Sequence, residues 1–186
     1  MRVIAGKFRS RPLRSLRGTD IRPTSDRLRE TLFNVLTAGN PQALTGSIWL
    51  DLFAGTGAVG IEAISRGAGM VYFVESSKPT IKLLYSNLHS LGIETGYQLL
   101  QQPALRGIAS VASMGVQPGF IFLDPPYRMQ ETYGETLDAL AESDLSARAL
   151  VIAEHGKKFD PGEQFGTLRR TRLLRQGDSA LSFYRC

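Results

Sequence analysis

Short apolar runs alternate along the chain with segments in which apolar residues recur at helical spacing. Five runs have the length and composition of buried strands, at residues 48–53, 70–75, 97–101, 119–124 and 149–153. Three helical segments lie between them, near residues 58–67, 78–91 and 131–143. Strands that alternate with helices pair in parallel, so the pattern predicts an α/β fold with a doubly wound, Rossmann-like sheet.

The two ends of the chain depart from this alternation. Past residue 23, a helical apolar stripe is formed by Leu28, Leu32, Val35 and Leu36. Thr24 or Ser25 can cap that helix. Near the other end, two strand-like runs flank residues 176–179 and predict an antiparallel hairpin. With the hairpin we expect a seven-stranded, mostly parallel sheet, and the 186 residues are most simply one domain.

The overall composition, 42% hydrophobic and 21% charged, is typical of a soluble globular protein. Its apolar runs fall short of the roughly 20 residues that a membrane helix needs. The first residues lack the apolar stretch of a signal peptide. The single cysteine, Cys186, cannot form a disulfide or a cysteine metal site within the chain. We therefore expect a cytoplasmic protein that uses neither a membrane nor a metal ion.

Positive charge is concentrated at the start of the chain. Residues 1–30 hold nine Lys or Arg and three acidic residues, a net charge of +6, while the remaining 13 basic and 14 acidic residues leave −1. Such an arm predicts a phosphate-rich partner. A solvated terminus is the alternative, but apolar residues interleave with the charges at Val3, Ile4, Phe8, Leu13 and Leu16. We expect residues 1–23 to form an ordered basic arm that docks on or beside the domain.

The residues of most chemical interest follow the predicted strands, where ligands bind in sheets of this kind. A G-x-G-x-x-G pattern formed by Gly55, Gly57 and Gly60 follows the first strand, and it also suits NAD. Asp51 precedes this pattern, where a carboxylate repels a pyrophosphate but suits a cationic ligand. Glu75 ends the second strand and is placed to accept both ribose hydroxyls; an exposed strand-end charge is the alternative.

The fourth predicted strand ends in FLDPPY, residues 122–127. Pro125 and Pro126 each fix a φ angle, which makes the backbone acceptors beside Asp124 rigid. A tight loop, in which Asp124 caps a turn and Tyr127 only packs, is the alternative. Because this ending is in register with the glycine loop and Glu75, we favour an active site.

Together, D-L-F-A-G-T-G from Asp51, V-E ending at Glu75 and D-P-P-Y from Asp124 resemble a class I S-adenosylmethionine-dependent methyltransferase. D-P-P-Y resembles the amino-methyltransferases, which modify exocyclic base nitrogens or, in one branch, a glutamine amide. Two further stretches, R-V-I-A-G-K-F-R-S-R-P-L and I-R-P-T-S-D-R-L-R-E-T-L-F-N-V-L, are similar to the bacterial 16S rRNA guanine-N2 methyltransferase family, RsmD. The resemblance covers nearly the whole chain.

The resemblance implies S-adenosyl-L-methionine as the cofactor. It places the ammonium group at Asp51, the ribose at Glu75, and the methionine part beside Phe53, Gly55 and Gly57. The family usually has an Asp or Asn before an alanine at the adenine, whereas this chain reads Gln102-Pro103-Ala104. Proline offers neither a side-chain acceptor nor an N–H, so Gln102, the Ala104 backbone or apolar packing is left to contact the adenine.

The resemblance also implies the catalytic and RNA-binding residues. Asp124 and the Pro125 carbonyl accept hydrogen bonds from the guanine amine, Pro126 stiffens the loop, and Tyr127 stacks on the base. Five arginines are expected to contact RNA: Arg9, Arg11, Arg14, Arg22 and Arg27. The expected substrate is 16S rRNA, free or in the assembling small ribosomal subunit, and we expect a monomer. An amino-methyltransferase of adenine N6 or protein glutamine, and a non-catalytic RNA-binding assembly factor, are the alternatives.

Overall fold

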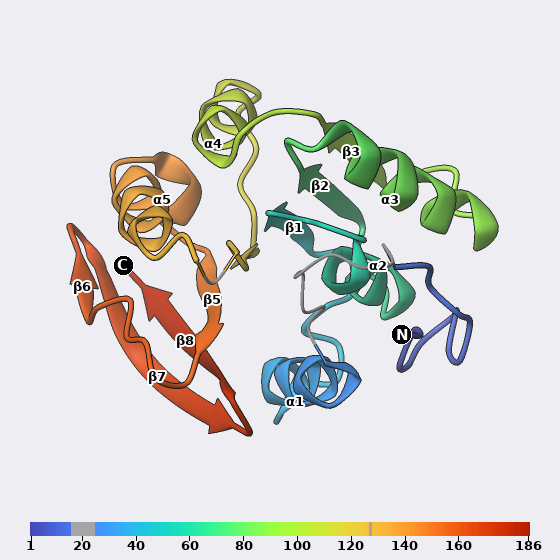
Figure 1. Cartoon of the computed structure of the whole chain (residues 1–186), viewed down its shortest axis with the longest axis horizontal. Coiled ribbons are helices and arrows are strands. Elements are labelled where there is room, and N and C mark those ends of the chain that lie inside the picture. The colour runs from blue at the N-terminus through green and yellow to red at the C-terminus, as the bar shows by residue number, and fades with distance from the viewer. Residues whose placement is uncertain (16–24, 127) are drawn as a thin grey trace.

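The computed structural model describes residues 1–15, 25–126 and 128–186, and these build an eight-stranded sheet (Figure 1). The strand order is β3-β2-β1-β4-β5-β8-β7-β6. The parallel strands are β1 (Ile48–Leu52), β2 (Met70–Val74), β3 (Tyr97–Leu100), β4 (Phe120–Leu123) and β5 (Leu150–Gly156). The antiparallel strands are β6 (Gln164–Phe165), β7 (Leu168–Gln176) and β8 (Ser179–Arg185).

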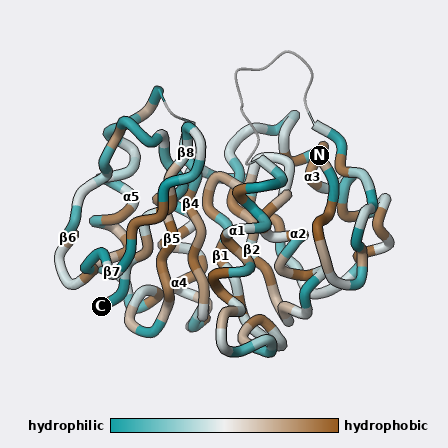
Figure 2. The backbone as a smooth tube through the Cα atoms, turned by 90° about the horizontal axis from the view of Figure 1, so that it is seen from below, coloured by the Kyte–Doolittle hydropathy of each residue, from teal (hydrophilic) through white to brown (hydrophobic). Residues whose placement is uncertain are grey.

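Helices cover both faces of this sheet (Figure 1). One face carries α1 (Asp26–Thr37), α2 (Ala58–Ser65) and α3 (Lys78–Ser90). The other carries α4 (Ala104–Ser113), α5 (Glu131–Ala141) and the short 3₁₀ helix η1 (Asp144–Ser146). Each face buries its own apolar cluster, and Figure 2 shows the apolar positions running along the central strands. No helix among the described residues is long and apolar enough to cross a membrane.

Alternation along β1 assigns its side chains to the two clusters. Trp49 points toward α1 and stacks between Phe33, at 5.5 Å, and Phe120, at 4.7 Å between ring centroids. Leu50 and Leu52 point toward α4 and α5. Large aromatic contacts of this kind bury more apolar area than the aliphatic pairs around them, and they fix α1 against the middle of the sheet.

The predicted fold class is confirmed: a mostly parallel doubly wound sheet ends in an antiparallel hairpin whose turn lies between Gln176 and Ser179. The two-residue strand β6 adds an eighth strand at the edge. Ser25 caps α1 and Ser77 caps α3, each accepting a backbone N–H. Thr24, the other predicted cap, lies outside the described residues.

The sequence interpretation missed α4. This helix contains Gly107, which weakens its helical signal. The glycine is required by packing, because a Cβ at this position would lie 2.5 Å from a methyl group of Val74. A close helix–sheet contact therefore offsets a poor local propensity.

Residues 1–15 of the basic arm fold back on themselves and lie against α2 and α3 (Figure 1). The Val3 N–H donates to the Arg11 carbonyl at 3.0 Å and the Ser10 N–H to the Val3 carbonyl at 2.8 Å. Val3 and Leu13 are buried in the α1–α3 cluster. Gly6 has φ 80° and approaches α2 so closely that a Cβ there would lie 1.9 Å from the Ser65 carbonyl oxygen. The rest of the predicted arm, from Leu16 to residue 23, lies outside the described residues.

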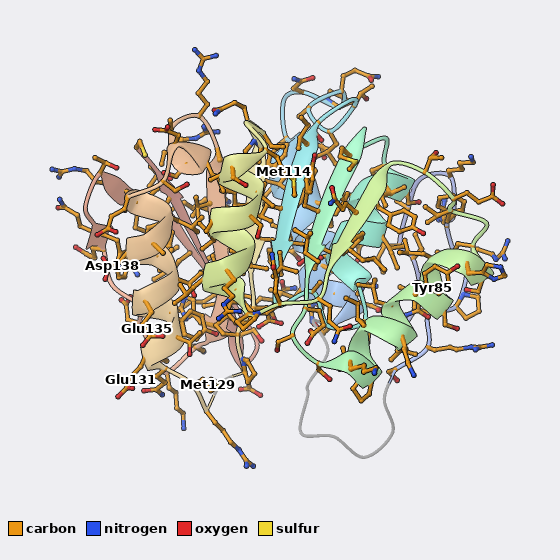
Figure 3. The ribbon with its side chains drawn as sticks, turned by 90° about the horizontal axis from the view of Figure 1, so that it is seen from above. Tyr85, Met114, Met129, Glu131, Glu135 and Asp138 are labelled. Atoms are coloured by element: carbon orange, nitrogen blue, oxygen red, sulfur yellow. The ribbon has the colours of Figure 1, made fainter. Side chains whose placement is uncertain are left out.

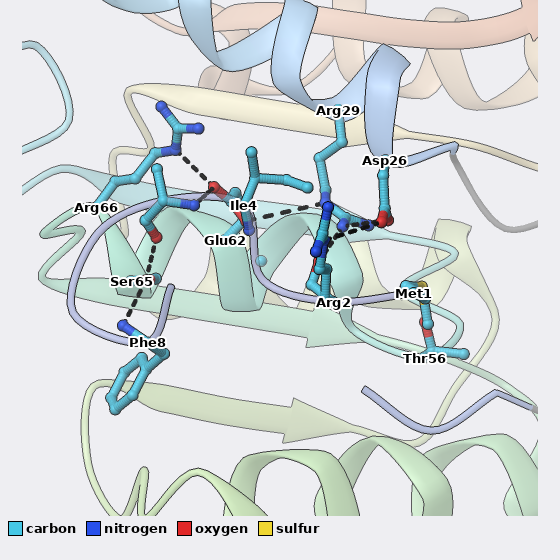
Figure 4. Close-up of polar contacts among 12 residues, drawn as sticks. Met1, Arg2, Ile4, Phe8, Asp26, Arg29, Thr56, Glu62, Ser65 and Arg66 are labelled. Atoms are coloured by element: carbon cyan, nitrogen blue, oxygen red, sulfur yellow. Dashed lines mark hydrogen bonds and ion pairs between the residues drawn. The ribbon is translucent and has the colours of Figure 1, made fainter. Parts of the chain in front are cut away.

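A buried carboxylate on α2 holds this arm in place (Figure 4). Glu62 accepts the Ile4 N–H at 2.7 Å and the Ala5 N–H at 3.0 Å, and its other partners are Arg66, at 2.7 Å, and Arg29, at 3.9 Å. Arg29 is also fully buried and donates to the Arg2 carbonyl and to Asp26. Burial lowers the pKa of Arg29, and the negative charges of Asp26 and Glu62 partly offset this by raising it. The arm, α1 and α2 thus meet at one ion-pair network.

Candidate functional site

Parallel pairing brings the predicted chemical residues to one edge of the sheet. Leu52 at the end of β1 is in register with Val74 of β2 and Leu123 of β4. The residue that follows β2 is Glu75, and the residue that follows β4 is Asp124. Strand geometry therefore places the glycine loop between these two carboxylates.

The glycine loop has an unusual backbone. Phe53, Gly55 and Gly57 all have positive φ, at 61°, 55° and 79°. A left-handed conformation is uncommon for phenylalanine and is found where surrounding structure and function impose it. Gly57 faces α3, where a Cβ would lie 2.0 Å from a methyl of Leu84, whereas a Cβ on Gly55 would meet only the Phe53 carbonyl, at 3.8 Å. The Gly55 side of the loop is thus open to a ligand.

Glu75 shapes this loop from the end of β2. Its carboxylate accepts the Gly55 N–H at 3.0 Å and the Ser77 N–H at 2.7 Å, one at each oxygen. The side chain is half-buried. Each carboxylate oxygen can accept a second hydrogen bond, so Glu75 can hold the loop and a ligand's hydroxyl groups at the same time.

Asp51 is buried beneath the same loop and accepts the Gly60 N–H at 3.0 Å. Burial raises the pKa of Asp51 to about 7, and the nearby negative charge of Glu75 adds to the increase, while the Gly60 hydrogen bond opposes it. A carboxyl group with this pKa gains from a cationic partner, which favours its ionised form.

Gln102 and Ala104 follow β3, one strand beyond Glu75. The Gln102 side-chain nitrogen Nε2 is buried and has no hydrogen-bond partner among the described residues. Pro103 caps α4 without a side-chain hydrogen bond, and Ala104 is buried. A buried amide donor without a partner is costly, and a ligand with an acceptor atom can satisfy it.

The D-P-P stretch leaves β4 on the other side of β1. Asp124 is half-buried, Pro125 is buried and Pro126 is exposed, and the Met129 N–H donates to the Pro126 carbonyl at 2.8 Å. Tyr127 lies outside the described residues. A cavity of about 290 Å³ is lined by Gln130, Tyr133, Gly156, Lys158 and Phe159, and it adjoins this stretch through Tyr133, which contacts the Pro125 carbonyl.

Sequence reasoning missed Tyr133, which braces the D-P-P stretch from α5. Its buried hydroxyl donates to the Glu154 carbonyl at 2.8 Å and lies 3.4 Å from the Pro125 carbonyl. Its ring packs on Phe159, with 5.1 Å between centroids. In the sequence, Tyr133 is simply an aromatic residue of a predicted helix, and such a residue more commonly belongs to the core.

The candidate RNA-binding arginines do not lie in the site itself. Arg9, Arg11, Arg14 and Arg27 are exposed on the arm and on the first turn of α1, and Arg22 lies outside the described residues. Arg11 donates to the Ser90 carbonyl at 2.9 Å and Arg14 to the Ser86 hydroxyl at 3.1 Å, both on α3. Sequence reasoning also missed Asn87, which joins the arm to the glycine loop through its side-chain amide.

Known proteins resemble this chain over most of its length. The family model described as conserved hypothetical protein 95 matches residues 1–185. The Bacillus subtilis protein YlbH is 35% identical over 188 residues, which cover 100% of this chain and 98% of that protein. Ribosomal RNA small subunit methyltransferase D of Haemophilus influenzae is 36% identical over 161 residues, 84% of this chain and 79% of that protein.

A solved structure agrees with these sequence relatives. The Thermus thermophilus protein TTHA0928 matches with a TM-score of 0.84 and 27% identity, over 100% of this chain and 99% of that one. The resemblance to the RsmD family, inferred above from the motifs, is confirmed by the family model and the curated relatives. This chain belongs to the family of the ribosomal RNA small subunit methyltransferases D.

Proposed function

We propose that this chain transfers the methyl group of S-adenosylmethionine to the exocyclic N2 amine of a guanine in 16S rRNA. It acts as a cytoplasmic monomer on free RNA or on the assembling small ribosomal subunit. The observation that carries this proposal is the placement of Asp124 and Pro125 at the end of β4, directly beside the glycine loop after β1. The names of the family's curated members support rRNA as the substrate.

The order of strands supports one direction of the cofactor along the sheet. Asp51, Glu75 and Gln102 belong to β1, β2 and β3 or their ends, which are consecutive neighbours in the sheet. S-adenosylmethionine fits them in the same order: its ammonium group at Asp51, its ribose hydroxyls at Glu75, and an adenine ring nitrogen at the unpartnered Gln102 Nε2. This orientation places the methionine end nearest β4 and the sulfonium between the ammonium group and the ribose. It also accounts for Pro103, which stands where the family usually has an Asp or Asn beside the adenine. Gln102 supplies a hydrogen-bond donor that proline lacks.

Bound S-adenosylmethionine supplies an activated methyl group. The chain's own task is to present a poorly nucleophilic amine in the correct orientation. Asp124 and the Pro125 carbonyl accept the two amine hydrogens, which turns the nitrogen lone pair toward the methyl donor. As positive charge develops on the nitrogen, the Asp124 carboxylate stabilises it and can take the released proton.

The target base enters the cavity beside the D-P-P stretch. The Tyr133 hydroxyl makes only a long contact of 3.4 Å with the Pro125 carbonyl, so this oxygen keeps a lone pair for the substrate. Phe159 and the stacking position proposed for Tyr127 offer aromatic surface to a base that has left its stack.

The charges on the surface favour RNA on the side of the arm. The exposed face of α5 carries an acidic row formed by Glu131, Glu135 and Asp138, which Figure 3 shows pointing away from the sheet. Such a row repels phosphates. Arg9, Arg11, Arg14 and Arg27 instead offer positive charge across the arm and the start of α1.

The reaction is tested by incubating the protein with 16S rRNA and labelled S-adenosylmethionine, then analysing the nucleosides by mass spectrometry. We expect N2-methylguanosine from the wild type. Asp124→Ala should lower kcat by about 100-fold or more, because it removes an acceptor that acts during transfer. Its cofactor Kd should change little.

Asp124→Asn is the matched control, because its amide oxygen still accepts one hydrogen bond, and it should retain more activity than the alanine variant. A methyl group on adenine N6 would overturn the guanine assignment. A wild type that binds cofactor and methylates no RNA would favour the assembly-factor alternative.

Cofactor affinity should depend on pH through Asp51. Below pH 7 this carboxyl is largely protonated in the free protein, so an ion pair with the cofactor's ammonium group requires a proton to leave. We expect the affinity to fall roughly tenfold between pH 7 and pH 5.5, where the ammonium group itself stays charged. Calorimetry in buffers of different ionisation enthalpy would detect the released proton. Asp51→Asn should bind more weakly and flatten the profile; an equally steep profile in that variant would remove Asp51 from the cofactor site.

The arm should contribute phosphate contacts. Replacing Arg9, Arg11 and Arg14 together with alanine should flatten the plot of log RNA affinity against log salt by about 0.7–0.9 per lost contact. The charge-matched control replaces Arg148, Arg169 and Arg185, which are exposed near the opposite, amino end of β5. This control should keep the wild-type slope. If the arm variant instead keeps its slope and only loses thermal stability, the arm is a brace and not an RNA surface.

A further inference from the structure

Asn87 on α3 is completely buried, and its side-chain amide binds two separate segments of the chain. Its Oδ1 accepts the Arg14 N–H at 2.9 Å. Its Nδ2 donates to the Arg14 carbonyl at 3.1 Å and to the Thr56 carbonyl at 2.9 Å. Both hydrogens of the amide are therefore used, one toward the arm and one toward the glycine loop.

On the arm side, the Asn87 amide bonds both the N–H and the carbonyl of Arg14, as the backbone of a neighbouring strand would. The side chains of Arg14 and Arg11 add hydrogen bonds to Ser86 and Ser90 on the same helix. This stretch of the arm is therefore attached to α3 and takes its position from that helix.

On the loop side, Thr56 lies between Gly55 and Gly57, the two glycines with positive φ. Its carbonyl is held by Asn87, and its hydroxyl lies 3.8 Å from the sulfur of Met1. Gly57 also packs against Leu84 of α3. The segment that we assign to the cofactor is thus connected to the arm by a single buried side chain and by Met1.

We propose that Asn87 is a positioning residue that couples cofactor binding to RNA binding. The proposal rests on the assignment of the glycine loop to S-adenosylmethionine and of the arm to RNA. A bound cofactor restricts the Gly55–Gly57 backbone, which fixes the Thr56 carbonyl. The fixed carbonyl holds the Asn87 amide, and the amide holds Arg14 and the arginines around it.

RNA then meets an arm that is already ordered, so part of the entropy cost of binding has been met by the cofactor. Linkage makes this effect reciprocal: RNA must raise cofactor affinity by the same factor. The coupling needs no movement of a domain, because the two segments share one amide.

The first test measures the affinity of a 16S rRNA transcript with and without S-adenosylhomocysteine, which occupies the cofactor site without allowing transfer. In the wild type we expect S-adenosylhomocysteine to tighten RNA binding by about fivefold or more. In Asn87→Ala this ratio should fall to about one. Equal RNA affinity with and without S-adenosylhomocysteine in the wild type, or an unchanged ratio in Asn87→Ala, would overturn the proposal.

Leu88→Ala is the control for lost stability. Leu88 is the next residue of α3, is fully buried in the apolar cluster, and its side chain makes no polar contact with either segment. This variant should be less stable and keep the wild-type ratio. A ratio that falls equally in both variants would show that loosening of α3, and not the Asn87 amide, is responsible.

Hydrogen exchange gives a readout that needs neither RNA nor a variant. S-adenosylhomocysteine should slow exchange of the Arg14 amide, which donates to Asn87, although our assignment places no arm residue on the cofactor. Unchanged exchange at Arg14 would overturn the link even if Asn87→Ala fails to fold. Slower exchange without tighter RNA binding would overturn the coupling to RNA, and the salt slope of the arm variant then shows whether the arm's RNA role has failed as well.

Discussion

The parallel pairing of β1 with β2 and β4 is the constraint on which the candidate site depends. Because Leu52, Val74 and Leu123 are in register, the three strands end at one level. The glycine loop, Glu75 and Asp124 therefore meet without any long connection to align them. A shift of two residues in either pairing would move one carboxylate by more than 6 Å. The residues proposed for the cofactor and those proposed for catalysis are positioned by the same backbone hydrogen bonds.

A second network ties the N-terminal arm to this frame. Glu62 and Arg29 are both buried charges, and burying an ion is unfavourable unless it is paired and hydrogen-bonded. The Ile4 and Ala5 N–H groups complete the shell around Glu62, while the Arg2 carbonyl contributes to the shell of Arg29. The network thus gives the arm a defined place beside α2. Arg11 and Arg14 are held separately, by hydrogen bonds to α3.

Much of the site could be predicted because its signals are local. Glu75 and Asp124 end apolar runs and Asp51 lies near the end of one, and the alternation of strands and helices places such positions at one edge. Asn87, Glu62 and Tyr133 could not be found in this way. Each is an ordinary polar or aromatic residue of a helix, and its role arises from backbone groups brought to it from distant segments. The helix α4 was missed because Gly107 weakens its local signal, and the close contact with Val74 that requires this glycine exists only in the fold.

The most direct test of this account is a crystal structure of the protein with bound S-adenosylhomocysteine. The account predicts adenine within hydrogen-bond distance of Gln102 Nε2, both ribose hydroxyls on Glu75, and the amino group at Asp51. The sulfur should then face Asp124 across the end of β1. An adenine ring in the cavity beside Tyr133 and Phe159, with Gln102 still without a partner, would reverse the order of the ligand along the sheet and contradict the account.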